Sequence, residues 1–299
     1  MTVKKLLLST LILSLLLLAA CSGTMTAATV EEPTPSPSGE PDEITCGPGV
    51  PYSMVCRIVD GAEEGSLLLA ELPTEGLIPS GGSVYRLSVK DIEVWLDGEK
   101  ADSSVLEDGM PIHISYRGPI LETYPAQISE VLTIEAYSLG SEQNPGGGYY
   151  DLCGFYLQVL DDLWEKDSGL NSGAELVSVD LSEAPGGLTD SEQSAIAWRF
   201  GELHGVTPLQ ATMEELKEGG YLTETKMSET TSFYEWEDGV YCSITDDSLE
   251  GEVFSLPVLK FTAHKWRTPL GAYWLSDCWA VWPEFGTWSG YDIGAEMIS

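Results

Sequence analysis

Residues 145–164 read PGGGYYDLCGFYLQVLDDLW, and the character of the chain changes within this stretch. The glycines at 146–148 interrupt any regular element. After them, apolar residues recur at the i, i+3 and i+4 spacing of one helix face, at Leu152, Phe155, Tyr156, Val159, Leu160, Leu163 and Trp164. We therefore predict a hinge at the glycines and a long helix directly after it.

The segment before the hinge, 45–142, is predicted to form a small β-barrel. Short runs rich in branched and aromatic residues are separated by turn dipeptides such as Asp60-Gly61 and Asp108-Gly109. Apolar and polar residues alternate over Pro111–Tyr116, as expected for a half-buried strand. About five or six such strands with no helical period favour closure into a barrel.

The segment after the hinge, 148–299, is predicted to be an α+β domain. A second helix begins at Thr189, where Glu192 completes a capping box, and a third begins at Thr212 with Glu215 in the same relation. The segments beyond Val240 have the composition of strands. Helices followed by several strands indicate an α+β fold, so the predicted fold class is a β-barrel followed by an α+β domain.

Residues 1–20 are predicted to be the signal peptide of a bacterial lipoprotein. Lys4 and Lys5 precede an apolar run, 6–20, which ends in two alanines directly before Cys21. The alternative is a transmembrane anchor, but the run has only 15 residues, whereas a bilayer-spanning helix needs about 20. We therefore expect the Cys21 thiol to carry a diacylglyceryl group.

Residues 21–44 are predicted to be an acidic, Pro-rich tether. The run EEPTPSPS at 31–38 favours an extended polyproline conformation. Acyl chains on Cys21 would hold the protein in the lipid bilayer. The expected location is the extracytoplasmic side of the cell membrane, with the folded part facing outward.

The charge of the chain excludes one class of partner. The formal net charge is −34, and loss of Lys4 and Lys5 with the signal leaves 12 basic against 48 acidic residues, a net charge of −36. Binding to nucleic acid needs clustered Lys and Arg, so a nucleic-acid partner is excluded. Adhesion to an anionic membrane surface is disfavoured for the same reason.

Five cysteines remain once Cys21 carries lipid, and an exported chain permits disulfides. Cys46 and Cys56 are candidates for one bridge, which would close a short loop. Cys242 and Cys278 are candidates for a second bridge, because both lie in strand-like runs. Cys153 is expected to be a small buried residue on the long helix.

Two segments resemble known protein families. The run ILETYPAQI at 120–128 resembles the end of small OB-like barrels in exported lipoproteins of Gram-positive gut bacteria. The run LTDSE at 188–192, continued through Phe200-Gly201 and 214–216 to IGAEMIS at 293–299, resembles a companion domain in uncharacterised lipoproteins of Clostridia-like organisms. The resemblance implies an OB-like barrel but no established activity. OB barrels often bind oligonucleotides or oligosaccharides, and the charge disfavours the first.

Motifs for catalysis, metal binding or a cofactor are missing from the sequence. The three histidines, His113, His204 and His264, have no metal-ligand spacing. The serine in GTWSG at 286–290 fails the spacing of a nucleophile elbow. We therefore predict no catalytic residue, no metal and no cofactor, and expect a non-enzymatic binding or interaction module.

Candidate ligand-binding residues gather near the end of the chain: His264, Lys265, Trp266, Arg267, Tyr273 and Trp274. More aromatic residues follow at Trp279, Trp282, Trp288 and Tyr291. A cationic spot ringed by aromatic side chains suits an extracellular glycan or an acidic peptide. The alternative is that the tryptophans fill a sheet core and the cations offset nearby acids. A glycan binder or hydrolase that uses this aromatic region is therefore the second functional prediction.

Overall fold

The computed structural model of the chain describes residues 51–73, 83–138, 150–228, 231–248, 258–283, 286 and 288–299. The predicted signal peptide, Cys21, the tether, Cys46 and the glycines at 146–148 lie outside these ranges. None of the helices within them is long and apolar enough to cross a bilayer.

The predicted barrel is confirmed, as a five-stranded mixed barrel. Its strands are β1 (Tyr52–Asp60), β2 (Ser66–Glu71), β3 (Val84–Ser88), β6 (Pro111–Leu121) and β7 (Ala126–Ala136). The hydrogen-bonded order is β3-β2-β1-β6-β7, and a parallel pairing of β3 with β7 closes the ring. A hairpin of β4 (Glu93–Leu96) and β5 (Glu99–Ala101) extends from β7, and a 3-10 turn (Ser103–Val105) leads into β6.

Strand β2 is buried on both faces. Leu67 and Leu69 point into the barrel, whereas Leu68 and Ala70 point outward into a second hydrophobic cluster that contains the helices. Burial on both faces explains why this strand is a continuous apolar run rather than an alternating one.

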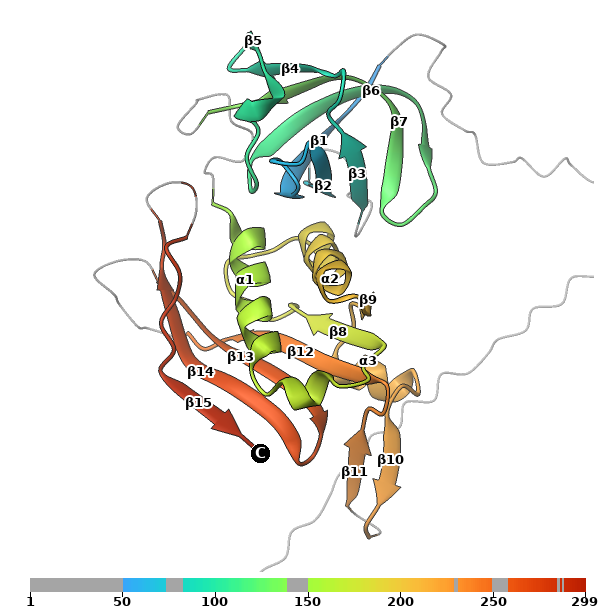
Figure 1. Cartoon of the computed structure of the whole chain (residues 1–299), viewed down its shortest axis with the longest axis vertical. Coiled ribbons are helices and arrows are strands. Elements are labelled where there is room, and N and C mark those ends of the chain that lie inside the picture. Colours follow the sequence, from blue (N-terminus) through green and yellow to red (C-terminus); the bar gives the residue numbers. More distant parts are fainter. Residues whose placement is uncertain are drawn as a thin grey trace, which may run out of the picture. The chain divides into compact units, whose positions relative to one another are not determined.

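The second part is a six-stranded sheet with helices, as predicted (Figure 1). The strand order is β15-β14-β13-β12-β8-β9. These strands are β8 (Leu176–Asp180), β9 (Thr207–Leu209), β12 (Gly239–Asp246), β13 (Val258–Thr268), β14 (Gly271–Val281) and β15 (Ala295–Ile298). Neighbours are antiparallel except for the parallel pairs β12–β8 and β8–β9.

The three predicted helices are confirmed as α1 (Leu152–Glu165), α2 (Asp190–His204) and α3 (Met213–Glu218). Asp151 caps α1 by accepting a hydrogen bond from the Gly154 N–H. The Thr189 and Thr212 capping boxes are both formed. Each satisfies backbone donors that would otherwise lack partners at the start of a helix.

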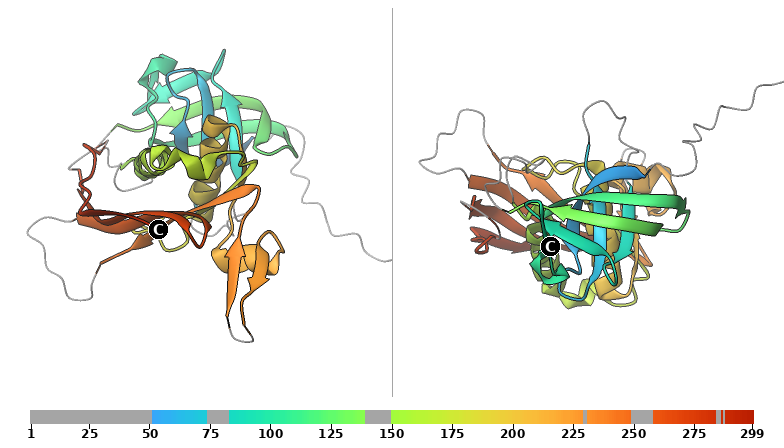
Figure 2. Two further views of the ribbon diagram at one scale, coloured as in Figure 1. Left: turned by 60° about the horizontal axis from the view of Figure 1, so that its bottom comes forward. Right: turned by 90° about the horizontal axis from the view of Figure 1, so that it is seen from above.

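Helices α1 and α2 cover one face of the six-stranded sheet, and their apolar side chains share a cluster with Val240, Phe261 and Leu275. The opposite face is covered at one end only. There α3 and a hairpin of β10 (Thr223–Lys226) and β11 (Ser232–Glu235) bury Trp236 and Tyr241. None of the described helices lies on the rest of that face (Figure 2). We call it the open face.

The barrel and the helices share one hydrophobic cluster. Val59, Leu68, Ala70 and Val84 of the barrel belong to the same cluster as α1 and α2. Two ion pairs add to this contact, Arg57–Glu192 at 2.5 Å and Arg199–Asp60 at 2.7 Å. Residues Gly47–Ser299 accordingly form one compact unit by their internal contacts.

Candidate functional site

Strand alternation divides the six predicted ligand-binding residues between the two faces of the sheet. On β13, Lys265 has the same parity as Phe261 and Ala263, which pack under the helices. Tyr273 on β14 also packs against that cluster. His264 and Trp274 point to the open face, whereas Trp266, on the same side of the sheet, packs against the cluster under α3 and the β10–β11 hairpin. The sequence placed the six residues together, but only His264 and Trp274 share the open face.

The two predicted cations are engaged in holding the fold. Lys265 is fully buried, and its ammonium donates to the carbonyl oxygens of Trp164 (3.0 Å) and Lys166 and to Oδ1 of Asn171 (3.2 Å). Arg267 donates to four further carbonyl oxygens, those of Trp236, Glu237, Leu170 and Ser172. The predicted cationic spot is therefore wrong, because these groups satisfy the free carbonyls at the end of α1 and in the adjoining turns.

Several of the aromatic residues fill the core, as the alternative interpretation held. Trp288 packs on Phe155 with ring centroids 4.6 Å apart, and Tyr291 packs on Phe261 at 5.6 Å. Trp282 lies against Trp288 in the same cluster. These three residues pack against the hydrophobic cluster under the helices.

A row of side chains crosses the open face of the sheet. Consecutive cross-strand partners run from β8 to β15 through Asp180, Ser243, His264, Trp274 and Met297. The His264 and Trp274 rings are stacked, with centroids 4.6 Å apart and planes inclined by 8°. Cross-strand pairs of this kind fix both rings in place.

A bulge in β14 adds a second tryptophan to this face. Three residues of β13, Phe261 to Ala263, oppose four of β14, Cys278 to Leu275, and Asp277 takes a left-handed conformation with φ of 51°. The extra residue reverses the alternation beyond it. Trp279 therefore points to the same side as Trp274 despite a spacing of five.

The two tryptophans are separated by a distance that the partner strand sets. Trp279 lies opposite Lys260, and Trp274 lies opposite His264. Four residues of extended strand measure about 13 Å. Trp279 is 43 % exposed, and Trp274 is partly exposed. Sequence reasoning included Trp279 among the aromatic residues but had no signal for the bulge that turns it outward.

The polar groups in the row do not form a proton relay. Asp180 accepts hydrogen bonds from the Tyr241 hydroxyl (2.7 Å) and the Ser182 hydroxyl (2.6 Å). Ser243 lies between Asp180 and His264, whereas acyl-transfer triads place histidine between serine and the acid. Burial lowers the pKa of His264 to about 4, so its ring is neutral at physiological pH. Its Nε2 has no hydrogen-bond partner among the described residues.

Metal-ligand clusters are also missing from the described part of the chain: no three His, Cys, Asp or Glu residues there are placed to hold a metal ion. Ser243 and the Nε2 atom of His264 are buried, so the accessible part of the open face consists of the Trp274 and Trp279 rings with partly exposed threonines beside them. Such a surface can bind a ligand through ring contacts and hydrogen bonds.

The predicted disulfide between Cys242 and Cys278 is wrong. Both thiols are free and buried. Cys242 lies on β12 and Cys278 on β14, with β13 between them, which separates their Cα atoms by at least about 9 Å. A disulfide tolerates only up to about 7 Å. Cys56 is also a free, buried thiol, and its proposed partner Cys46 lies outside the described residues.

The barrel surface that OB folds commonly use for ligands is occupied within the chain. In OB folds, the face around the second and third strands binds oligonucleotides or oligosaccharides. Here α2 packs against β1, β2 and β3. Arg86 of β3 donates twice to the Glu202 carboxylate of that helix, at 2.6 Å each. The open sheet face is therefore the better candidate site.

Comparison with known proteins found no match to this chain among family models, curated proteins or solved structures.

Proposed function

We propose that the chain is an exported binding protein, anchored by lipid on Cys21, that holds a neutral oligosaccharide on the open face of its six-stranded sheet. The anchor rests on the sequence of residues 1–21, and the ligand class rests on the geometry of β13 and β14.

One observation carries the ligand class. The β14 bulge places Trp279 on the same face as Trp274, about 13 Å along the sheet. The 43 % exposed indole of Trp279 and the partly exposed indole of Trp274 together leave apolar surface on one face that a ligand can cover. Sugar rings present C–H groups that pack on indole faces, and two separated indoles suit a ligand longer than a single ring.

The surroundings favour a neutral sugar. Thr245 and Thr262 are cross-strand partners in the row next to Ser243 and His264. Both threonines are partly exposed, and hydroxyl groups match the hydrogen-bonding groups of a saccharide. With a net charge of −36 after loss of the signal, the protein repels phosphorylated or carboxylated glycans.

The geometry favours retention of the sugar over its hydrolysis. A glycosidase places two carboxyl groups on either side of the scissile bond. Asp180, the carboxylate in the row, already accepts hydrogen bonds from Tyr241 and Ser182 and lies three strands from Trp274. The Asp247 carboxylate is likewise engaged, by the Thr262 hydroxyl at 2.5 Å.

The test is a glycan array probed with residues 22–299, which omit the lipidated cysteine. We expect retention of neutral oligosaccharides, and about tenfold weaker binding for Trp279→Ala and Trp274→Ala. Phe233→Ala is the matched control, because this exposed aromatic residue belongs to β11, away from the row. Unchanged binding in both tryptophan variants, with a native circular dichroism spectrum, would show that the sugar binds elsewhere. An array without any retained neutral glycan contradicts the proposal itself.

A further inference from the structure

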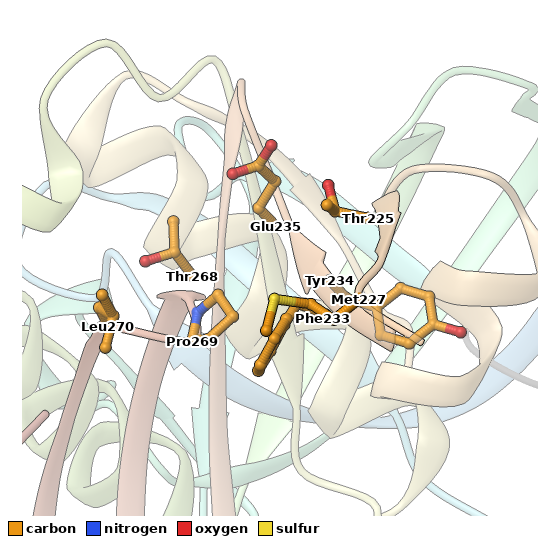
Figure 3. Close-up of a pocket in the computed structure, with 8 residues that line it drawn as sticks. All are labelled: Thr225, Met227, Phe233, Tyr234, Glu235, Thr268, Pro269 and Leu270. Carbon is orange, nitrogen blue, oxygen red and sulfur yellow. The ribbon is translucent and has the colours of Figure 1, made fainter. Parts of the chain in front are cut away.

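A second surface lies apart from Trp274 and Trp279, between the β10–β11 hairpin and the β13–β14 turn. The groove there has a volume of about 520 Å³. Thr268, Pro269 and Leu270 of the turn form one side, and Met227 and Phe233 of the hairpin form the other (Figure 3). Thr225, Tyr234 and Glu235 complete the lining.

The apolar side chains of this groove are unusually exposed. Leu270 is 86 % exposed, Met227 is 69 % exposed and Phe233 is 39 % exposed. Scattered single apolar residues are common on protein surfaces, but three that converge on one groove mark an interaction site.

The groove is preformed. Arg267 donates to the carbonyl oxygens of Trp236 and Glu237 directly after β11, and the Trp236 N–H donates to the Arg267 carbonyl oxygen (2.8 Å). Trp236 itself is fully buried against Leu216 of α3. The hairpin is thus fixed to β13 at its base, so that little ordering is needed when a ligand binds.

The negative charge of the groove and of the whole chain favours a positively charged partner. Glu235 is the one carboxylate among the eight lining residues, and none of the eight is basic. The Lys217 ammonium, which lies 5.3 Å from the centroid of the Tyr234 ring, is paired with the Glu214 carboxylate at 3.0 Å. A second copy of the chain would bring another large negative charge into the groove, and an anionic membrane would do the same. Positive charge on the partner is attracted instead.

We propose that this groove docks a cationic peptide segment of another protein. Its apolar side chains lie between Met227, Phe233 and Leu270, and its Lys or Arg residues face Glu235. The apolar contacts supply affinity, and the charges exclude acidic partners and other copies of the chain.

The test measures fluorescence anisotropy of labelled synthetic peptides with residues 22–299. A peptide of alternating lysine and leucine should bind. Peptides of alternating glutamate and leucine, or lysine and serine, should bind at least about tenfold more weakly. Raising the salt from about 0.05 M to about 0.5 M should weaken the lysine–leucine complex severalfold.

Variants identify the groove as the binding surface. Met227→Ser and Leu270→Ser should each weaken binding of the lysine–leucine peptide about tenfold, and Glu235→Gln should weaken it severalfold. All three residues lie at the surface, and Leu203→Ser is the control, an exposed leucine on α2 that should leave binding unchanged.

Four outcomes would overturn the proposal. Equal binding of the lysine–serine peptide, or unchanged affinity in both serine variants, would show that only the general acidity of the surface attracts the probe. Self-association in sedimentation experiments that Leu270→Ser abolishes would assign the groove to a second copy. Binding to phosphatidylglycerol vesicles that Leu270→Ser abolishes would assign it to the membrane.

Discussion

The Lys265 ammonium lies 3.0 Å from the carbonyl oxygen of Trp164, at the end of helix α1. The last carbonyl groups of a helix have no hydrogen-bond donors within the helix. Here a lysine from the sheet beneath donates hydrogen bonds to them. Burial lowers the pKa of Lys265, but its hydrogen bonds to this set of oxygens offset part of the cost of burying a charge.

Replacement of this lysine tests its structural role. Lys265→Met should lower the free energy of unfolding by about 3 kcal/mol, because several buried carbonyl oxygens lose their donor. Lys166→Met is the comparison, since Lys166 forms a largely exposed ion pair with Glu296 and should cost less than about 1 kcal/mol. Urea unfolding measures both. Equal costs for the two variants would mean that Lys265 does not hold the end of the helix.

Sequence patterns predicted the fold better than they predicted the candidate binding site. Capping boxes at Thr189 and Thr212 and the apolar spacing after Asp151 are local signals, and the helices begin where these signals place them. The side of a strand that a helix will cover is not local. Lys265 and His264 are adjacent in sequence, yet one lies under α1 and the other on the open face.

The acidic group at the start of α1 links stability to pH. Burial, reinforced by the Asp108 carboxylate and opposed by the Gly154 N–H, raises the pKa of Asp151 to about 6. The folded state therefore holds this proton more tightly than the unfolded state, whose pKa is about 4. The stability that the folded protein gains by binding this proton is fully present below pH 4 and is lost as the pH rises through about 6.

Asp151→Asn should remove this loss while keeping the cap, because asparagine is an equally good N-cap residue. Above about pH 6.5 the variant should be more stable than the parent by up to roughly 3 kcal/mol, and below about pH 4 the two should converge. Thermal unfolding across this range measures the difference. Asp102→Asn is the control. Hydrogen bonds from Ser104 lower the pKa of that exposed group, so its replacement should give no gain at neutral pH.

Because the barrel and the helices share one hydrophobic cluster, we expect them to unfold cooperatively. Leu68 of β2 packs into the same cluster as Phe200 of α2 and Leu160 of α1. Leu68→Ala should cost about 3 kcal/mol and should accelerate hydrogen exchange in α1 and α2 as well as in β2. Leu121→Ala, at an exposed site on β6, should change neither the free energy of unfolding nor the hydrogen-exchange rates. Faster exchange confined to β2 would indicate that 45–142 and 148–299 open independently.

The bulge in β14 shows why the placement of Trp274 and Trp279 on one face could not be predicted from the sequence. Trp274 and Trp279 are five residues apart, which in a regular strand places them on opposite faces. Asp277, in its left-handed conformation, is the site of the bulge that brings the two tryptophans to one face. It packs closely on Gly294, since a Cβ added to Gly294 would lie 2.6 Å from the Asp277 Cβ. Aspartate tolerates this conformation but occurs widely elsewhere, so it gives no distinctive signal.

The cysteines of the folded part should be inert and unbridged. Burial raises the pKa of Cys242 and of Cys278 to about 12 each, and raises those of Cys56 and Cys153 as well. Only the thiolate reacts with a disulfide reagent, so residues 47–299 should show almost no reaction while native, even near pH 8. After unfolding without reductant, all four thiols should react, and reductant should leave the melting temperature unchanged. Two reactive thiols in place of four would reveal a disulfide, and rapid labelling of the native protein would contradict the burial of these strands.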